Sequence, residues 1–273
     1  MSRVLPDMPT STAKVWVIQA DDRPFTIHRE SKPLAYDAGD DTRAMMRSLN
    51  GGSLARRWDY WTSSLLINRL KCQIVGCPHK GIPIRPGDHP DRHVTWAKIR
   101  LVSDFMRDHP EVGIVAFLDS DAFIRDEERF MALAQALISD PEKHGILSRD
   151  PIMSKNTYVN TGCMILKNDA FIHEFLRTIW RNGDRQQRYR LEWPHEQFLV
   201  SEFVQSHRES FHICRTAVLN TPCGQIVRHS WWKDLFQELV EDEFKATVAK
   251  LCFKVSSDPT ASPPLDLQAL LDP

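Results

Sequence analysis

Residues Val112 to Leu118 read Val-Gly-Ile-Val-Ala-Phe-Leu, and the chain continues as Asp119-Ser120-Asp121. An uncharged run of this length, ended by acidic residues, is typical of a strand that is buried on both faces. Such strands belong to sheets that are covered by helices on both sides. Ligands of these folds bind beyond the carboxyl ends of the strands. The stretch therefore predicts an α/β fold with a binding site at the two aspartates.

The segments around this strand alternate between helical and extended patterns. From Val94 to Met106 the apolar residues follow helical spacing, and His109-Pro110 ends that pattern. A second amphipathic helix is predicted at 130–138. Other helices are predicted at 42–49, 58–70, 169–180, 195–205 and 233–252, strands at 14–20, 145–147 and 163–166, and a loop at 77–90. This order predicts an α/β protein with a single Rossmann-like, mostly parallel sheet flanked by helices.

Composition excludes several classes of protein. The chain has 273 residues, of which 42% are apolar and 26% charged, and its formal net charge is −1. These values exclude wholesale disorder and argue against a strongly basic nucleic-acid binder. No apolar run reaches the roughly 18–20 residues that a membrane-spanning helix needs. We expect one domain at 12–254, between a disordered leader at 1–11 and a disordered, acidic, proline-rich tail at 255–273.

The cysteines and the N-terminal residues bear on the compartment. Six cysteines, at positions 72, 77, 163, 214, 223 and 252, form no CxxC pair, which argues against a zinc ribbon. One or two disulfides and six reduced thiols are both compatible with this spacing. The first residues lack the apolar core of a secretory signal. The sequence therefore favours a cytoplasmic protein, or one of the Golgi lumen if an anchor has been removed.

Two carboxylates at i and i+2 beyond a buried strand suit a hard divalent cation that also takes oxygens from a diphosphate. In the simpler interpretation, Asp119 begins a turn and Asp121 caps the helix that starts near Asp126. The apolar strand directly before the pair favours the metal site. Phosphatases that form an aspartyl phosphate also carry Asp-x-Asp after a strand. They want Thr or Val four residues after the first Asp, where this chain has Phe123, so we reject that interpretation.

Several blocks of residues together resemble the galactosyl-/mannosyl-/xylosyltransferase family 34. They are Trp96-Ala-Lys98-Ile-Arg-Leu-Val, Asp108-His-Pro-Glu-Val112, Phe117-Leu-Asp-Ser-Asp-Ala-Phe123, Val159-Asn-Thr-Gly-Cys-Met-Ile-Leu-Lys-Asn168, His195-Glu196-Gln197 and Val227-Arg-His229. The similarity covers about residues 92–232. The family contains retaining, metal-dependent enzymes of the GT-A nucleotide-diphospho-sugar transferase fold, among them yeast α-mannosyltransferases and plant xyloglucan xylosyltransferases. Glu196 stands where the family usually has Asp.

The resemblance implies a metal site and a donor site. Asp121 and His229 would bind the metal, with Asp119 on the metal or on the ribose. Oxygen ligands with one imidazole suit Mn²⁺ (or Mg²⁺) better than Zn²⁺. The implied donor-binding residues are Lys98, Asp119, Ser120, Asn160, Thr161 and Gly162, with Gln19 and Asp21 where GT-A proteins hold base and ribose. For residues 160–162 and 19–21, the alternative interpretation is an ordinary turn without a role in binding. For Lys98, the alternative is a solvated surface lysine.

The resemblance also implies the catalytic residues. Gln197 would lie nearest the anomeric carbon, and Glu196 would bind hydroxyls of the donor or the acceptor. A carboxylate nucleophile would give retention by double displacement, as in retaining glycosidases. Because an amide is a poor nucleophile, we favour front-face attack, in which Gln197 steadies the oxocarbenium-like charge. Three tryptophans, at positions 193, 231 and 232, flank two of these blocks. Two interpretations are open for them: stacking on an acceptor sugar, or packing in the interior.

These features predict a glycosyltransferase that moves a hexose or pentose with retention. The donor would be a UDP-sugar, which we favour, or GDP-mannose, and the acceptor a glycan or glycoconjugate. The alternatives are a catalytically inactive nucleotide-sugar-binding protein of the same fold and a structural α/β module without metal dependence. The joint presence of Asp119, Asp121, His229 and Gln197 favours the enzyme.

Overall fold

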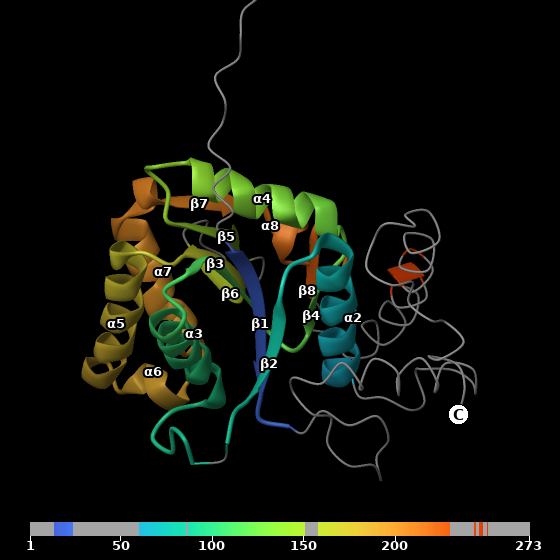
Figure 1. Cartoon of the computed structure of the whole chain (residues 1–273). Coiled ribbons are helices and arrows are strands. Elements are labelled where there is room, and N and C mark those ends of the chain that lie inside the picture. The colour runs from blue at the N-terminus through green and yellow to red at the C-terminus, as the bar shows by residue number, and fades with distance from the viewer. Residues whose placement is uncertain are drawn as a thin grey trace, which may run out of the picture.

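The chain is built around a mixed β-sheet, shown for the computed structural model in Figure 1. The structure describes residues 14–23, 60–85, 87–150 and 158–229, and the single positions 243, 246, 247 and 250. The strands of the sheet are β1 (Lys14–Asp21), β2 (His79–Pro83), β3 (Val112–Leu118), β5 (Gly145–Arg149), β6 (Val159–Lys167) and β7 (Phe211–Cys214), in the spatial order β2-β1-β3-β6-β5-β7. Strand β6 is antiparallel to both neighbours, and the other pairings in this sheet are parallel. The predicted α/β fold with a mostly parallel sheet is confirmed.

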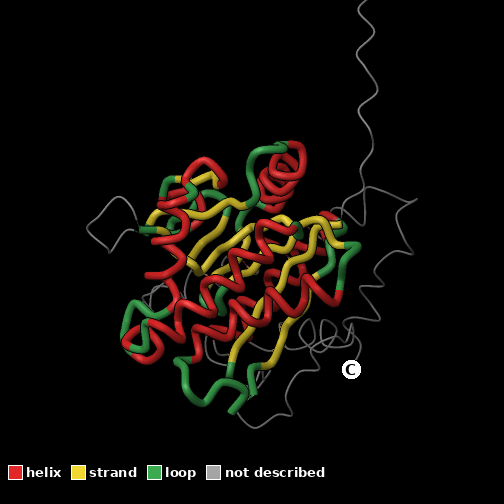
Figure 2. Tube along the Cα trace, turned by 90° about the vertical axis from the view of Figure 1, so that its left-hand side faces the viewer, coloured by secondary structure: helices red, strands yellow, loops and turns green. Residues whose placement is uncertain are grey.

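Helices cover both faces of this sheet (Figures 1 and 2). They are α2 (Tyr60–Val75), α3 (Ala97–Asp108), α4 (Glu127–Ser139), α5 (Ala170–Arg185), α6 (Arg188–Leu191), α7 (Glu196–Ser206) and α8 (Thr216–Leu219), with 3₁₀ turns η2 (Val94–Trp96) and η3 (Arg208–Ser210). Helices α3, α5 and α7 lie on one face, and α2 and α4 lie on the other. This arrangement explains why the central strand β3 contains no polar side chain.

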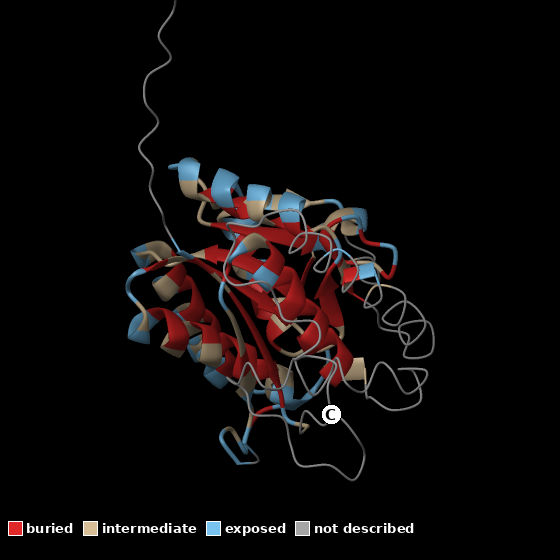
Figure 3. Ribbon diagram, turned by 45° about the vertical axis from the view of Figure 1, so that its right-hand side comes forward, coloured by how far each residue is buried: buried red, intermediate tan, exposed pale blue. Residues whose placement is uncertain are grey.

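Strand β3 shows how the two faces are used. Val115 and Phe117 belong to the core on the side of α3, α5 and α7. Ile114 and Ala116 belong to the core that includes residues of α2 and α4. Because successive side chains of a strand point to opposite faces, a continuous apolar run serves both cores. Figure 3 shows the resulting buried interior between the helical layers.

Polar side chains mark the starts of two helices. Asp126 accepts a hydrogen bond from the Arg129 amide at 3.0 Å and caps α4. Asp169 accepts one from the Ile172 amide at 3.0 Å and caps α5. Such caps satisfy amides that have no partner within the helix. Since Asp126 caps α4, the interpretation of Asp121 as a helix cap is excluded.

A short ribbon outside the main sheet joins distant parts of the chain. Strand β4 (Ala122–Ile124) pairs antiparallel with β8 (Val227–His229), and Ala122 lies opposite His229. The side chain of Asn68 in α2 holds β4 in place. Its Nδ2 donates to the Ala122 carbonyl at 3.0 Å, and its Oδ1 accepts from the Ile124 amide at 2.7 Å. The ribbon therefore brings His229 to the loop that contains Asp119 and Asp121.

Most of the predicted elements occur with small shifts of their ends. The predicted loop at 77–90 is wrong in part, because it contains β2, which pairs with β1. The short strands β4 and β7 were not predicted at all. The predicted helices at 42–49 and 233–252, the leader and the tail lie outside the described residues, apart from the single positions given above.

The described cysteines and helices complete the description of the fold. The five described cysteines, at 72, 77, 163, 214 and 223, are free thiols. Burial raises the pKa of the Cys163 thiol well above its usual range. Within the described part of the chain, no helix is both long and apolar enough to cross a membrane.

Candidate active site

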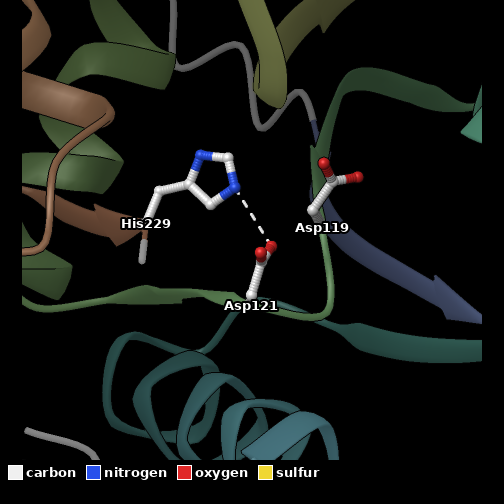
Figure 4. Close-up of side chains that lie close together, drawn as sticks. All are labelled: Asp119, Asp121 and His229. Carbon is white, nitrogen blue, oxygen red and sulfur yellow. Dashed lines mark hydrogen bonds and ion pairs between the residues drawn. The ribbon is translucent and has the colours of Figure 1, made fainter. Parts of the chain in front are cut away.

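Three potential metal ligands meet at the carboxyl end of β3. Asp119 and Asp121 follow this strand, and His229 ends β8. Each offers one ligand atom, and these atoms lie within 4.8 Å of one another. Figure 4 shows the His229 ring directed at Asp121, with 3.0 Å between Nε2 and Oδ1. The three residues that the resemblance assigned to the metal are thus brought together.

The orientation of His229 is fixed from behind by Asn220. The Nδ1 atom of His229 lies 2.7 Å from Oδ1 of Asn220, which is fully buried. The Asn220 amide nitrogen donates to the Arg149 carbonyl at 3.1 Å, which settles which atom of the amide faces the ring. Because an amide oxygen only accepts, Nδ1 carries a hydrogen, and Nε2 is the atom that faces the aspartates. No sequence pattern marks Asn220, and the sequence analysis missed it.

The charges of this group are strongly coupled. Burial disfavours a charge on His229, but Asp121 and Asp119 outweigh it and raise the pKa of the imidazole. Burial also opposes the charge of Asp121, yet His229 lowers the pKa of this carboxyl. The pKa of Asp119 is raised by burial, against the effect of Lys98. Two half-buried carboxylates beside a buried imidazole are chemically suited to a cation.

Lys98 of α3 supplies a fixed positive charge at the same place. Its Nζ lies 2.7 Å from Oδ1 of Asp119 and 3.4 Å from Oε1 of Glu196. Burial disfavours its charge, but the two carboxylates raise its pKa above the usual range. The side chain is 5% exposed, so it is not a solvated surface lysine.

The donor set fits a divalent ion of the Mn²⁺ or Mg²⁺ type. Two carboxylates and one imidazole offer two oxygen ligands and one nitrogen ligand, all within 4.8 Å of one another. Three protein ligands leave coordination positions for oxygens of a bound diphosphate.

A second group of polar residues adjoins the aspartates through β6. The amide of Asp119 donates to the Gly162 carbonyl at 2.8 Å. The Thr161 hydroxyl donates to Oε1 of Glu196 at 2.9 Å, and the Thr161 amide donates to Oε1 of Gln197 at 3.3 Å. Glu196 is buried, and its Oε2 has no hydrogen-bond partner among the described residues. Burial opposes the charge of Glu196, but Lys98 holds its pKa below the usual value.

Asp150, just beyond the end of β5, connects this second group. Its Oδ2 accepts from Nε2 of Gln197 at 2.8 Å and from Nδ2 of Asn160 at 3.2 Å. Oδ1 of Asn160 in turn accepts from the Gly162 amide at 2.8 Å. The sequence analysis missed Asp150, although a carboxylate directly after a strand is the signal that identified Asp119. It is the residue that orients the amide of Gln197.

A cavity opens beside the metal ligands at the end of β1. Its lining includes Ala20, Asp21, Asp22, Arg23, Tyr60, Ile84, Val94, Thr95, Lys98, Phe117, Asp119, Ser120 and Asp121. Arg23 forms a two-point contact with Asp21, at 2.6 and 2.7 Å, and donates to the Ser120 hydroxyl at 3.2 Å. The Arg23 guanidinium also lies 4.2 Å from the ring centre of Trp61. Asp21 and Ser120 therefore reach the cavity that Asp119 and Asp121 border.

Gln19 has a different position from the one predicted. It is 1% exposed and does not line the cavity. Its amide nitrogen donates to the carbonyls of Asp119 and Ala122, both at 3.2 Å, and its Oε1 lies 3.2 Å from Nε2 of His79. Gln19 therefore supports the aspartate loop from behind, and its position gives no support to the predicted contact with a donor.

Comparison with known proteins agrees with this geometry. Residues 84–158 match the sequence profile described as the galactosyl transferase GMA12/MNN10 family. Over 116 residues the chain is 33% identical to "Probable glycosyltransferase 3" of Oryza sativa, in both subspecies indica and japonica. That stretch is 41% of this chain, and it spans 25% of the length of the rice proteins.

Solved structures share the fold at low identity. One is a glycosyltransferase involved in glycosylation of the major capsid of PBCV-1, with a TM-score of 0.57, 14% identity, and coverage of 82% of this chain and 98% of that one. Another is the apo-form glycosyltransferase GlyE of Streptococcus pneumoniae, with a TM-score of 0.50, 12% identity, and coverage of 91% and 66%. The chain therefore has the GT-A glycosyltransferase fold, and over residues 84–158 its resemblance to the galactosyl transferase GMA12/MNN10 family, family 34, is confirmed.

Proposed function

We propose that this protein is a retaining glycosyltransferase that transfers a sugar from a nucleotide-diphosphate sugar, with a UDP-sugar favoured, to a carbohydrate or glycoconjugate. The observation that carries the proposal is the grouping of Asp119, Asp121 and His229 at the end of β3 in this fold. Two carboxylates and an imidazole beside a cavity suit a diphosphate bound together with a divalent cation. A structural module would have no reason to gather these groups at one place.

Different residues would bind the diphosphate and the nucleoside of the donor. Asp121 and His229 would hold Mn²⁺ or Mg²⁺, with Asp119 as a further ligand or on the ribose. When bound, the cation offsets charge that develops on the leaving diphosphate. Lys98 adds a buried positive charge next to Asp119. Asp21 and Ser120, at the other side of the cavity, are suited to hydroxyls of the nucleoside.

The sugar would lie over the group formed by Asn160, Thr161, Glu196 and Gln197. Gln197 is held by the Thr161 amide and by Asp150, so its amide dipole has a fixed direction. A preorganised dipole stabilises charge that appears in the transition state. Glu196 is engaged by Lys98 and Thr161, which favours a role in binding hydroxyls. Front-face attack, in which an oxygen of the leaving phosphate takes the proton of the acceptor, needs no carboxylate nucleophile.

The test is donor hydrolysis across a panel of nucleotide sugars, with and without Mn²⁺. UDP-galactose, UDP-glucose, UDP-xylose and GDP-mannose each release the free nucleotide if the protein turns them over. Proton NMR of the first product formed from the reactive donor identifies its anomer, and we expect the donor's own α-configuration. Binding of a nucleotide without turnover of any donor would support the inactive binding protein. Inversion of the anomer would contradict the retaining mechanism.

A further inference from the structure

Three large apolar side chains are exposed on one border of the candidate active site. Among the described residues, Leu191 is 66% exposed, Trp193 62% and Val94 37%. Leu191 ends α6, Trp193 lies in the connection to α7, and Val94 begins η2. These segments are about a hundred residues apart in the chain, so their meeting at the surface is a product of the fold. We refer to Val94, Leu191 and Trp193 as the apolar platform.

Contacts between the two segments hold the platform together. The amide of His93 donates to the carbonyl of Arg190 at 2.7 Å, which joins the segment that contains Val94 to the segment that contains Leu191. The rings of His93 and His195 stack face to face, with centroids 3.9 Å apart and planes 3° from parallel. Trp193 lies two residues before His195. The platform is therefore fixed by a backbone hydrogen bond and a ring stack.

Buried contacts beneath the platform make it rigid. The indole nitrogen of Trp96 donates to the Tyr189 carbonyl at 2.9 Å, and Trp96 is fully buried. Arg190 contacts Asp184 at 2.7 Å, and Arg92 contacts the same carboxylate. A surface that is ordered before binding loses less conformational entropy when a ligand arrives. These contacts favour a binding role over accidental exposure.

The platform is continuous with the cavity. Val94 belongs to the platform and also lines the cavity, next to Thr95, Lys98 and Asp119. On the other segment, His195 directly precedes Glu196 and Gln197, the first residues of α7. Gln197 and Asp119 are hydrogen-bonded to the adjacent β6 residues Thr161 and Gly162, so a molecule resting on the platform would lie next to both. That is the position from which a second substrate would attack a bound donor.

The size and chemistry of the platform indicate its occupant. Stable protein interfaces bury about 800 Å² on each partner, and three side chains fall far short of that area. An exposed indole flanked by aliphatic groups matches the apolar C–H face of a pyranose ring. Glu192 and Arg188 contact each other at 2.9 Å beside Leu191, so the rim carries balanced charge. A neutral sugar ring is the ligand that meets these conditions.

We propose that the apolar platform binds the acceptor carbohydrate, with a sugar ring stacked on Trp193 and its edge against Val94 and Leu191. The inference rests on the proposed function and adds the direction from which the acceptor enters. The acceptor approaches over α6 and η2, so the hydroxyl that attacks points toward Gln197. Trp193 sets affinity for the acceptor and takes no part in binding the nucleotide.

The test compares Trp193→Ala, Trp193→Phe and the control Arg188→Ala with the unchanged protein. Arg188 is 70% exposed and lies on α6, the short helix that also contains Leu191, but it contributes no apolar surface to the platform. The probes are lactose, cellopentaose, α-mannobiose and methyl xyloside, measured by saturation-transfer NMR with Mn²⁺ and UDP present, and as acceptors in transfer assays. We expect Trp193→Ala to raise the acceptor KM about tenfold or more. Trp193→Phe should recover most of the loss, and Arg188→Ala should change little.

Donor hydrolysis without acceptor separates the two proposals. It should stay unchanged in Trp193→Ala, because Trp193 is not among the residues that line the cavity beside the metal ligands. If the unchanged protein hydrolyses a donor but Trp193→Ala keeps the acceptor KM, or if no carbohydrate probe gives a saturation-transfer signal, the platform proposal is wrong while the enzyme stands. If the unchanged protein hydrolyses no donor, the proposed function itself has failed.

Discussion

The imidazole of His229 occupies the space that a side chain at position 162 would need. A Cβ atom built on Gly162 would lie 2.1 Å from Cε1 and 2.7 Å from Nδ1 of this ring. Such distances are far below van der Waals contact, and the Gly162 backbone is fixed by the amide of Asp119. The glycine predicted as part of the sugar site therefore has a further role. It makes room for the histidine of the metal site.

Gly162→Ala should displace His229 and weaken the metal site. The ring would lose its hydrogen bond to Asn220 and its alignment with Asp121, so we expect affinity for Mn²⁺ with UDP to fall at least about tenfold. Gly145→Ala is the matched control, since its Cβ would meet Leu166 and Phe211 of the core at 2.9–3.1 Å. That control should lower the melting temperature and leave the effect of Mn²⁺ intact. Equal Mn²⁺ affinity in Gly162→Ala and the unchanged protein would contradict this packing argument.

Asn220→Ala should also weaken metal binding, although Asn220 is not itself one of the three potential metal ligands. The substitution removes the acceptor that fixes the Nδ1 hydrogen of His229. Partners of this kind typically contribute 10–100-fold to metal affinity, and we expect a loss in that range by calorimetry. Asn220→Asp retains an acceptor for Nδ1 and should recover part of the affinity. A purely structural role would instead lower the melting temperature of both variants equally, without a difference in Mn²⁺ affinity between them.

Gln197→Ala should lower kcat and leave nucleotide affinity nearly unchanged. The Gln197 amide is held by Thr161 and Asp150, so we expect it to act on charge that appears in the transition state. Loss of one such dipole typically costs about 10²–10³ in rate.

Asp150→Asn extends this test to the residue that orients Gln197. The Asp150 carboxylate accepts hydrogen bonds from the side-chain amides of Gln197 and Asn160, and the variant loses its negative charge. We therefore expect kcat to fall, while the KM values for acceptor and donor change less. If Gln197→Ala kept full kcat and lost donor affinity, Gln197 would be a binding residue.

The sequence predicted the parts of the site that lie next to strong local patterns. Asp119 and Asp121 were identifiable because an apolar run of seven residues precedes them. His229 was assigned through the resemblance alone, since β8 has three residues and no periodicity that could be read. Asn220 and Asp150 were missed because their roles come from contacts across 9 and 47 residues of chain. Such contacts depend on how β5, β6 and β8 are arranged, and no local spacing encodes that.

The errors in the fold have a similar cause. Proline and glycine predicted a loop at 77–90, yet β2 forms there because it lies at the edge of the sheet, beside β1. An edge strand tolerates proline at its end, as at Pro83. The reversed direction of β6 could not be predicted either, because a strand that is buried on both faces looks the same in both directions. The position of Gln19 in β1 was readable from the sequence, but the direction of its side chain, behind the aspartate loop, was not.

The stability of the fold should depend on His79 below neutral pH. Nε2 of His79 faces Oε1 of Gln19, an acceptor, so Nε2 carries the hydrogen. The Nδ1 atom is buried without a hydrogen-bond partner among the described residues. Burial, with Arg69 nearby, lowers the pKa of His79 from 6.5 to about 3. The folded protein therefore resists a proton that the unfolded chain accepts.

The contribution of His79 is fully present above pH 6.5 and is lost as the pH falls toward 3, by at most about 1.4 kcal/mol per pH unit. His79→Gln should lose this dependence, so its stability relative to the unchanged protein should improve from pH 7 to pH 4. Urea unfolding at a series of pH values measures this, with His212→Gln on the exposed face of β7 as the control. Parallel stability curves for His79→Gln and the unchanged protein would contradict the assignment.

Calorimetric titration of UDP, with and without Mn²⁺, tests the metal-dependent donor site most directly. The unchanged protein should bind UDP at least about tenfold more tightly with Mn²⁺. Asp121→Ala should lose that enhancement while keeping a cooperative thermal transition, because Asp121 lies at a strand end and not in either apolar core. Asp126→Ala removes a nearby carboxylate that only caps α4 and should keep the enhancement, with a stability loss of about 1 kcal/mol. An equal Mn²⁺ effect in Asp121→Ala, or none in the unchanged protein, would contradict the account.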